Sequence, residues 1–98
     1  MEKVRLYQVS FVFDDDMDVS GVLPYHDKVV STMVSQGIVI SHSITKKKNK
    51  VIIVFKVASE SELQFHIDKL PITPFTWYDY ERLESIEVYS VFSTYSLN

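Results

Sequence analysis

Residues 59–75, SESELQFHIDKLPITPF, decide most of the fold because they form a helix pattern with both ends marked. Ser59 and Glu62 have the spacing of a capping box, in which each side chain accepts a hydrogen bond from the other residue's backbone amide. Pro71 ends the helix, since the residue before a proline is pushed out of helical geometry. Between these ends runs one apolar stripe at i, i+4 and i+7, formed by Leu63, Ile67 and Leu70.

Two apolar stretches before this helix have the composition of strands. Val4 to Phe13 is rich in β-branched and aromatic residues, and both of its faces are largely apolar, apart from Gln8 and Ser10. Val51 to Val57 is almost continuously apolar and predicts a central strand. Strands of this kind are covered on both faces. In a chain with few helices, we expect another subunit to supply the second cover.

A helix and a strand are predicted between these two stretches. Pro24 to Gln36 predicts the helix, and Gly37 follows where a left-handed residue commonly ends one. Its expected buried positions are Val29, Val30, Met33 and Val34. Ile38 to Thr45 alternates as a strand, with one face formed by Ile38, Ile40, His42 and Ile44. The short polar turn after it predicts antiparallel pairing with the next strand.

Two strand candidates remain at the end of the chain, Phe75 to Glu81 and Ser85 to Ser93. One of them completes the sheet, and the other extends an edge or reaches a neighbouring subunit; the sequence leaves the choice open. The element order is then strand, helix, strand, strand, helix, strand, which is the ferredoxin-like split βαβ arrangement. We therefore expect an α+β sandwich, with two helices on one face of a four-stranded antiparallel sheet, that dimerises through its other face.

The composition excludes several classes of function. The 98 residues suit one domain, and a net charge of -3 provides no basic face for nucleic acid. Cysteine is absent, so no thiol can act as a nucleophile or ligand. With only two glycines, Gly21 and Gly37, no phosphate-binding loop is expected. No apolar run spans a membrane and the N-terminus has no signal pattern, so we expect a cytoplasmic protein.

Histidines are the main candidates for chemistry. His26 shares the apolar face of the first predicted helix, where burial and the helix dipole favour the neutral imidazole. A neutral imidazole suits a general base or a hydrogen-bond donor, although a half-buried histidine bonded to a carbonyl or to water is the alternative. His42 is either a core histidine or a pocket residue. With His66 included, the three histidines match no local metal-ligand spacing, so no metal or other cofactor is expected.

Several motifs along the chain resemble the muconolactone isomerase family. They are Gly37 after the first helix, Ser61-Glu62-Leu63 at the start of the second, and above all Leu70-Pro71-Ile72-Thr73-Pro74-Phe75 at its exit. The similarity extends roughly from Tyr7 to Glu81. It implies a dimeric α+β barrel built from a single domain over residues 1–98, with an extra C-terminal strand or arm at about 84–98. It also implies cofactor-independent isomerisation of a small unsaturated lactone by proton transfer.

The resemblance places a site between the first helix and the sheet. Where the family has a glutamate followed by a lysine, this chain has His26 and Asp27, and Pro24-Tyr25-His26 is similar to the P-x-H turn of YCII-like relatives of the same superfamily. The expected catalytic residues are His26, His42 and Tyr7. The expected substrate-binding residues are Tyr25, Trp77, Tyr78 and Asp79, with the aromatic rings as pocket walls and Asp79 as a partner for a histidine.

Two functions stay open at this level. One is an isomerase acting on a lactone-like or aromatic-derived metabolite, and the other is a non-catalytic dimeric module that binds a small ligand or only assembles. In either case the expected partners are a second copy of the chain and a small molecule, with no nucleic acid and no membrane. A cavity beside His26 favours a ligand site, whereas a core filled by Phe11, Met33 and Leu63 favours assembly alone.

Overall fold

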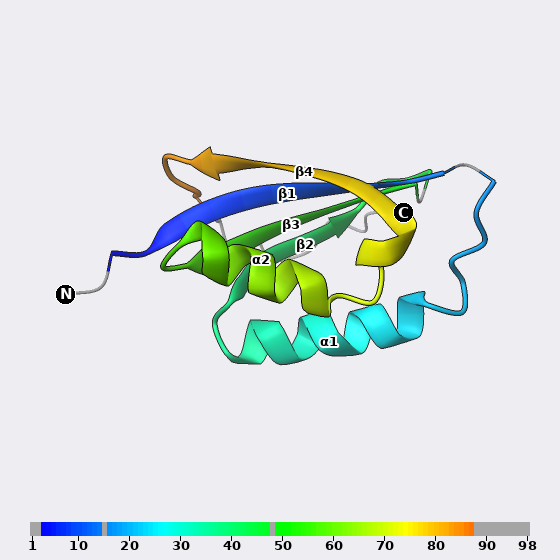
Figure 1. Ribbon diagram of the computed structural model, residues 1–98, viewed down its shortest axis with the longest axis horizontal. Helices are drawn as coiled ribbons and strands as arrows, with labels where there is room; N and C mark the ends of the chain where they lie inside the picture. The colour runs from blue at the N-terminus through cyan, green and yellow to red at the C-terminus, as the bar shows by residue number, and fades with distance from the viewer. Residues whose placement is uncertain (1–2, 15, 48, 88–98) are drawn as a thin grey trace, which may run out of the picture.

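The computed structural model describes residues 3–14, 16–47 and 49–87 of the chain. Its elements follow the predicted order (Figure 1). They are β1 (Arg5–Phe13), α1 (Leu23–Ser35), β2 (Val39–Ile44), β3 (Lys50–Val57), α2 (Glu60–Lys69), the 3-10 helix η1 (Thr73–Phe75) and β4 (Thr76–Leu83). The first of the two C-terminal candidates therefore completes the sheet as β4. The second has no strand at residues 85–87, and the rest of it lies outside the described residues.

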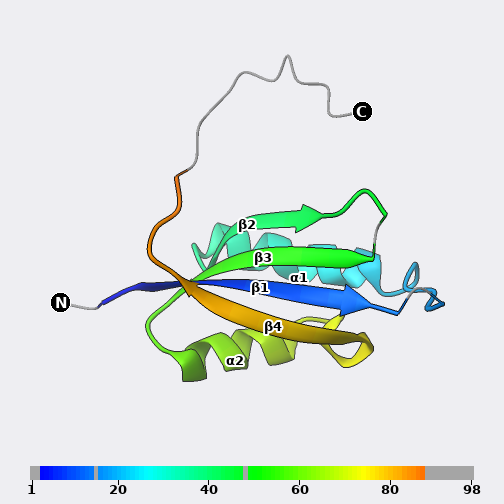
Figure 2. The same cartoon turned by 90° about the horizontal axis from the view of Figure 1, so that it is seen from above.

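The four strands form one antiparallel sheet in the order β2-β3-β1-β4. Both helices lie against the same face of this sheet (Figure 1), α1 behind β2 and β3 and α2 at the β4 side (Figure 2). The α+β class, the antiparallel sheet and the placement of both helices are confirmed. The arrangement is compatible with the ferredoxin-like fold.

The core lies between the sheet and the two helices. Strand side chains alternate between the two faces, so the odd-numbered residues of β1 and β3 turn toward the helices. These side chains are buried, as are Phe11, Met33 and Leu63, which were expected to fill the core. Burial of this apolar surface is the main force that holds the helices on the sheet.

The ends of α2 follow the predicted signals, with one difference at the start. Ser59 Oγ accepts from the Glu62 amide at 3.2 Å. The Glu62 carboxylate accepts from the amide of Ala58 at 2.6 Å, one residue earlier than the capping box predicted. At the other end Leu70 is extended, as expected of a residue before proline. The helix is thus held at both ends by its own sequence.

Two positions differ from the predicted burial pattern. Val34 is about half exposed, with 51% of its surface open, so α1 buries a narrower stripe than expected. In β2, the pairing shifts between Val39 and Ser41, which is an irregularity of the β-bulge kind at Ile40. The extra residue reverses the alternation at that point, so Val39 faces the helices and Ile40 does not. After the shift, His42 keeps its predicted face.

The opposite face of the sheet carries no helix in the part of the chain that the structure describes. It presents the even-numbered residues of β1 and β3 and, by their pairing, alternate residues of β4. Apolar side chains on it are exposed, among them Val12 at 40% and Trp77 at 67%. None of the described helices is long and apolar enough to cross a membrane.

Candidate functional site

The site begins with the first turn of α1. Pro24 lies in this turn, where its missing N–H costs no helical hydrogen bond, and the His26 amide donates to the Val22 carbonyl at 3.0 Å. His26, Val30 and Met33 are the buried residues of the helix, at the i, i+4 and i+7 positions of one face. His26 is completely buried. Its predicted place on the apolar face of the helix is confirmed.

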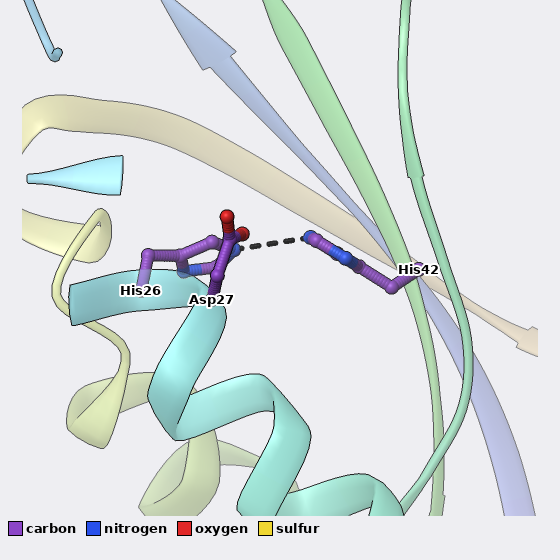
Figure 3. Close-up of side chains that lie close together, drawn as sticks. All are labelled: His26, Asp27 and His42. Carbon is purple, nitrogen blue, oxygen red and sulfur yellow. Dashed lines mark hydrogen bonds between the residues drawn. The ribbon is translucent and has the colours of Figure 1, made fainter. Parts of the chain in front are cut away.

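His42 reaches the same point from β2. It pairs with Ile53, a buried residue on the helix-facing side of β3, so its ring turns toward α1. The Nε2 atoms of His26 and His42 are 3.2 Å apart, a hydrogen-bonding distance (Figure 3). The ring centroids are 5.2 Å apart and the rings are tilted by 53°. We call these two residues the histidine pair.

Burial keeps both rings of the pair neutral. The pKa of His26 is lowered to about 4, mainly by burial and also by His42, while Asp27 opposes the shift. Burial also lowers the pKa of His42, and again Asp27 opposes the shift. Between two neutral imidazoles, one Nε2 carries the hydrogen and the other accepts it. The pair is therefore a single hydrogen-bonded unit at neutral pH.

Asp27 is the third member of the cluster, and sequence reasoning gave it no role. The nearest donor atoms of His26, Asp27 and His42 all lie within 4.8 Å of one another (Figure 3). The carboxylate is exposed, whereas the two rings are buried or half-buried. The one sequence feature that could have indicated a role for Asp27 is its position directly after a histidine in the first helical turn. His66, the third histidine, belongs to α2 and lies 3.7 Å from Glu62 instead.

Tyr7 and Tyr25 are not brought into contact with the histidine pair. Tyr7 is buried on the helix-facing side of β1, where its hydroxyl accepts from Arg5 at 3.4 Å and its ring meets that of Tyr80. β3 separates β1 from β2, so the strands that carry Tyr7 and His42 are about 10 Å apart, and the two residues are also offset by two positions along β3. Tyr25 precedes His26 but is 69% exposed.

The three candidates on β4 lie at the opposite edge of the sheet from β2. Trp77 and Asp79 pair with Val12 and Ser10, so they belong to the face without helices. Tyr78 is on the helix-facing side, where its hydroxyl accepts from Gln64 at 2.9 Å. Asp79 accepts from the Tyr80 amide at 2.9 Å. The carboxylate beside the histidines is thus that of Asp27, and not that of Asp79 as expected.

An apolar hollow lies further along α1 and β2 from the histidine pair, and neither histidine lines it. Its volume is about 340 Å³, and its lining residues are Phe13, Leu23, Ile44, Thr45, Lys46 and Val51. Leu23 lies one helical turn before His26, and Ile44 lies two residues after His42 on the same face of β2. The hollow therefore opens at the end of the pair where α1 begins and the β2–β3 hairpin turns.

A second hollow, of about 370 Å³, lies on the open face of the sheet. Its lining includes Trp77, Tyr78 and Asp79, together with Gln8 and Lys50. Three of the four residues expected to bind substrate, those on β4, thus line a different hollow from the apolar one near the start of α1, and Tyr25 lines neither.

No family model matches this chain, and no curated protein matches it.

Proposed function

We propose that the chain is a small proton-transfer enzyme, in which the histidine pair isomerises a compact, largely apolar ligand held in the nearby apolar hollow. The observation that carries this proposal is the 3.2 Å contact between the Nε2 atoms of the buried His26 and the half-buried His42. The hollow begins at Leu23, one helical turn before His26. Groups that act as acid or base must lie within hydrogen-bonding reach of the proton they move. The resemblance to muconolactone isomerases suggests a lactone-like or aromatic-derived ligand.

The reaction has two proton steps. One imidazole removes a proton from a carbon next to the ligand's carbonyl group, and the electron pair of that C–H bond moves onto the oxygen as an enolate. The imidazolium then returns the proton to a different carbon, which shifts the double bond and restores the neutral ring. Asp27 stabilises the imidazolium by its negative charge, as its opposing effect on both histidine pKa values indicates.

Lys46 supplies the charge that such a reaction needs at the oxygen. It lines the apolar hollow near the start of α1. An ammonium group near a developing oxyanion stabilises the transition state more than the uncharged ground state. In this proposal the ligand extends from the hollow, whose lining provides the cation, to the histidine pair beyond it, which provides the base.

The same proposal includes a homodimer formed through the open face of the sheet. Val12 and Trp77 are exposed there, and an apolar sheet face of this kind is normally covered. The alternative function, an assembly module without a reaction, is favoured by one observation. Phe11, Met33 and Leu63 fill the interior, so the ligand hollow lies at the edge of the core and not inside it.

Deuterium exchange tests the reaction. The protein is incubated in D₂O with a chelator and a panel of small unsaturated lactones and phenolic acids, and proton NMR follows deuterium uptake and double-bond migration. We expect exchange with at least one compound, and its loss in His26→Gln and His42→Gln. His66→Gln is the matched control, since this histidine lies outside the cluster. Equal exchange in all four proteins would overturn the role of the pair.

A further inference from the structure

Three donor groups of the kind that bind transition metals converge between α1 and β2. They are the Nε2 atoms of His26 and His42 and the carboxylate of Asp27 (Figure 3). Two imidazoles with one carboxylate form a ligand set typical of zinc and of ferrous iron, whereas magnesium and calcium prefer oxygen donors. The cluster forms only when α1 packs on β2, so no local sequence motif predicts it.

The distance between the Nε2 atoms of His26 and His42 fits the binding of one metal ion by both rings. Zinc-to-imidazole bonds are about 2.0–2.1 Å long, and in a tetrahedral site two such nitrogens lie about 3.3 Å apart. The observed separation of 3.2 Å corresponds to an angle of about 103° at the metal for bonds of that length. An ion at that position lies off the line between the two nitrogens, so each ring has to turn until its Nε2 lone pair points at the ion. The ring that carries a hydrogen on Nε2 in the metal-free pair also has to move it to Nδ1.

Asp27 needs only a side-chain rotation to complete the set. Its carboxylate lies within 4.8 Å of both donor nitrogens, against about 3.3 Å in a tetrahedral site, so it has to approach by at most about 1.5 Å. It is exposed in the first turn of the helix. Three protein ligands would leave a fourth position open for water or a ligand.

The second nitrogen of His26 does not decide between the metal-free and metal-bound states. Nδ1 of this ring is buried without a hydrogen-bond partner among the described atoms. It stays unpaired in either tautomer of the metal-free pair and equally in the metal-bound pair. An unpaired buried group is unfavourable, but this cost is common to all three states.

We propose that His26, Asp27 and His42 form a binding site for a divalent transition-metal ion of the zinc type. This inference stands apart from the proton-transfer function and does not need it. The two uses of the pair exclude one another at any moment, because both require the same Nε2 lone pairs. If both are correct, bound metal inhibits the deuterium exchange proposed above.

Direct metal binding tests the proposal without any substrate. The full chain, freed of metal by dialysis against a chelator, is titrated with Co²⁺ and its visible absorption recorded, and Zn²⁺ is titrated by calorimetry. We expect one ion per chain and the intense visible bands of a four-coordinate cobalt site. We also expect the affinity to fall at least about tenfold in Asp27→Asn and further in His42→Gln.

Two results would overturn the metal site. One is a cobalt spectrum identical to that of the free aqueous ion. The other is equal binding in the parent chain, Asp27→Asn and His42→Gln, with loss only in His66→Gln, which would assign the ion to the His66–Glu62 contact.

Asp27 is exposed, so its asparagine variant should fold normally, and circular dichroism checks this. The exchange assay contains a chelator, so its result does not depend on bound metal. The metal titration contains no substrate, so its result does not depend on the proposed reaction.

Discussion

Acid should destabilise the metal-free protein through His26. The pKa of this ring is about 4 in the folded chain and 6.5 in the unfolded chain, so the unfolded state binds the proton more readily between these values. Protonation of His26 therefore leaves the free energy of unfolding unchanged above pH 6.5 and lowers it as the pH drops from 6.5 to 4. Below pH 4 this residue causes no further decrease. The linkage relation gives a loss of about 2.5 kcal/mol at pH 4.5, which we reduce to about 2 kcal/mol for relaxation around the charged ring.

The comparison with His26→Leu isolates this effect. Leucine removes the titrating ring and leaves an apolar side chain of similar size in a fully buried position. Urea unfolding of both proteins at pH 7.5 and 4.5, with a chelator present, gives four free energies of unfolding. Titrating groups that do not contact His26 contribute equally to both proteins and cancel. The parent chain should lose about 2 kcal/mol more than the variant between the two pH values. Equal losses would show that His26 titrates normally and would refute the argument from burial.

Three further predictions concern the fold and its assembly. Ser59→Ala should lower the free energy of unfolding by about 1 kcal/mol, because the Glu62 amide loses its 3.2 Å acceptor; an unchanged urea midpoint would contradict this. Ile67→Ala, at a fully buried position, should cost about 2–5 kcal/mol in the same assay, and a cost below 1 kcal/mol would mean that α2 is not packed as described. Val12→Asp places a charge on the open sheet face and should convert the proposed dimer to a monomer in sedimentation velocity. Phe65→Asp, at a more exposed position on α2, should not; dissociation by both or by neither would exclude the open face as the interface.

The fold was predictable because its signals are local. The capping pair at Ser59 and Glu62, the proline at position 71 and the apolar periodicity of each segment are all read within a few residues. Alternation along β1 likewise follows from the two-residue period of any strand. The exception is the register shift at Ile40, because no local residue preference marks the extra residue there.

The site was only partly predictable because it depends on contacts between distant segments. His26 and His42 each follow from a local pattern, and both patterns point toward the same interface between the first helix and the sheet. The position of Trp77 and Asp79 depends instead on the register of β4 against β1, which decides the face that each side chain takes. Asp27 joins the pair only once α1 is laid across β2.

Nitrogen-15 NMR of the imidazole rings shows whether His26 and His42 form one neutral, hydrogen-bonded pair that responds to a ligand. In metal-free protein at pH 7, we expect two neutral rings whose Nε2 signals both shift when one compound of the lactone and phenolic-acid panel is added, while His66 does not respond. Two rings that titrate independently near pH 6.5 and ignore every compound would contradict it.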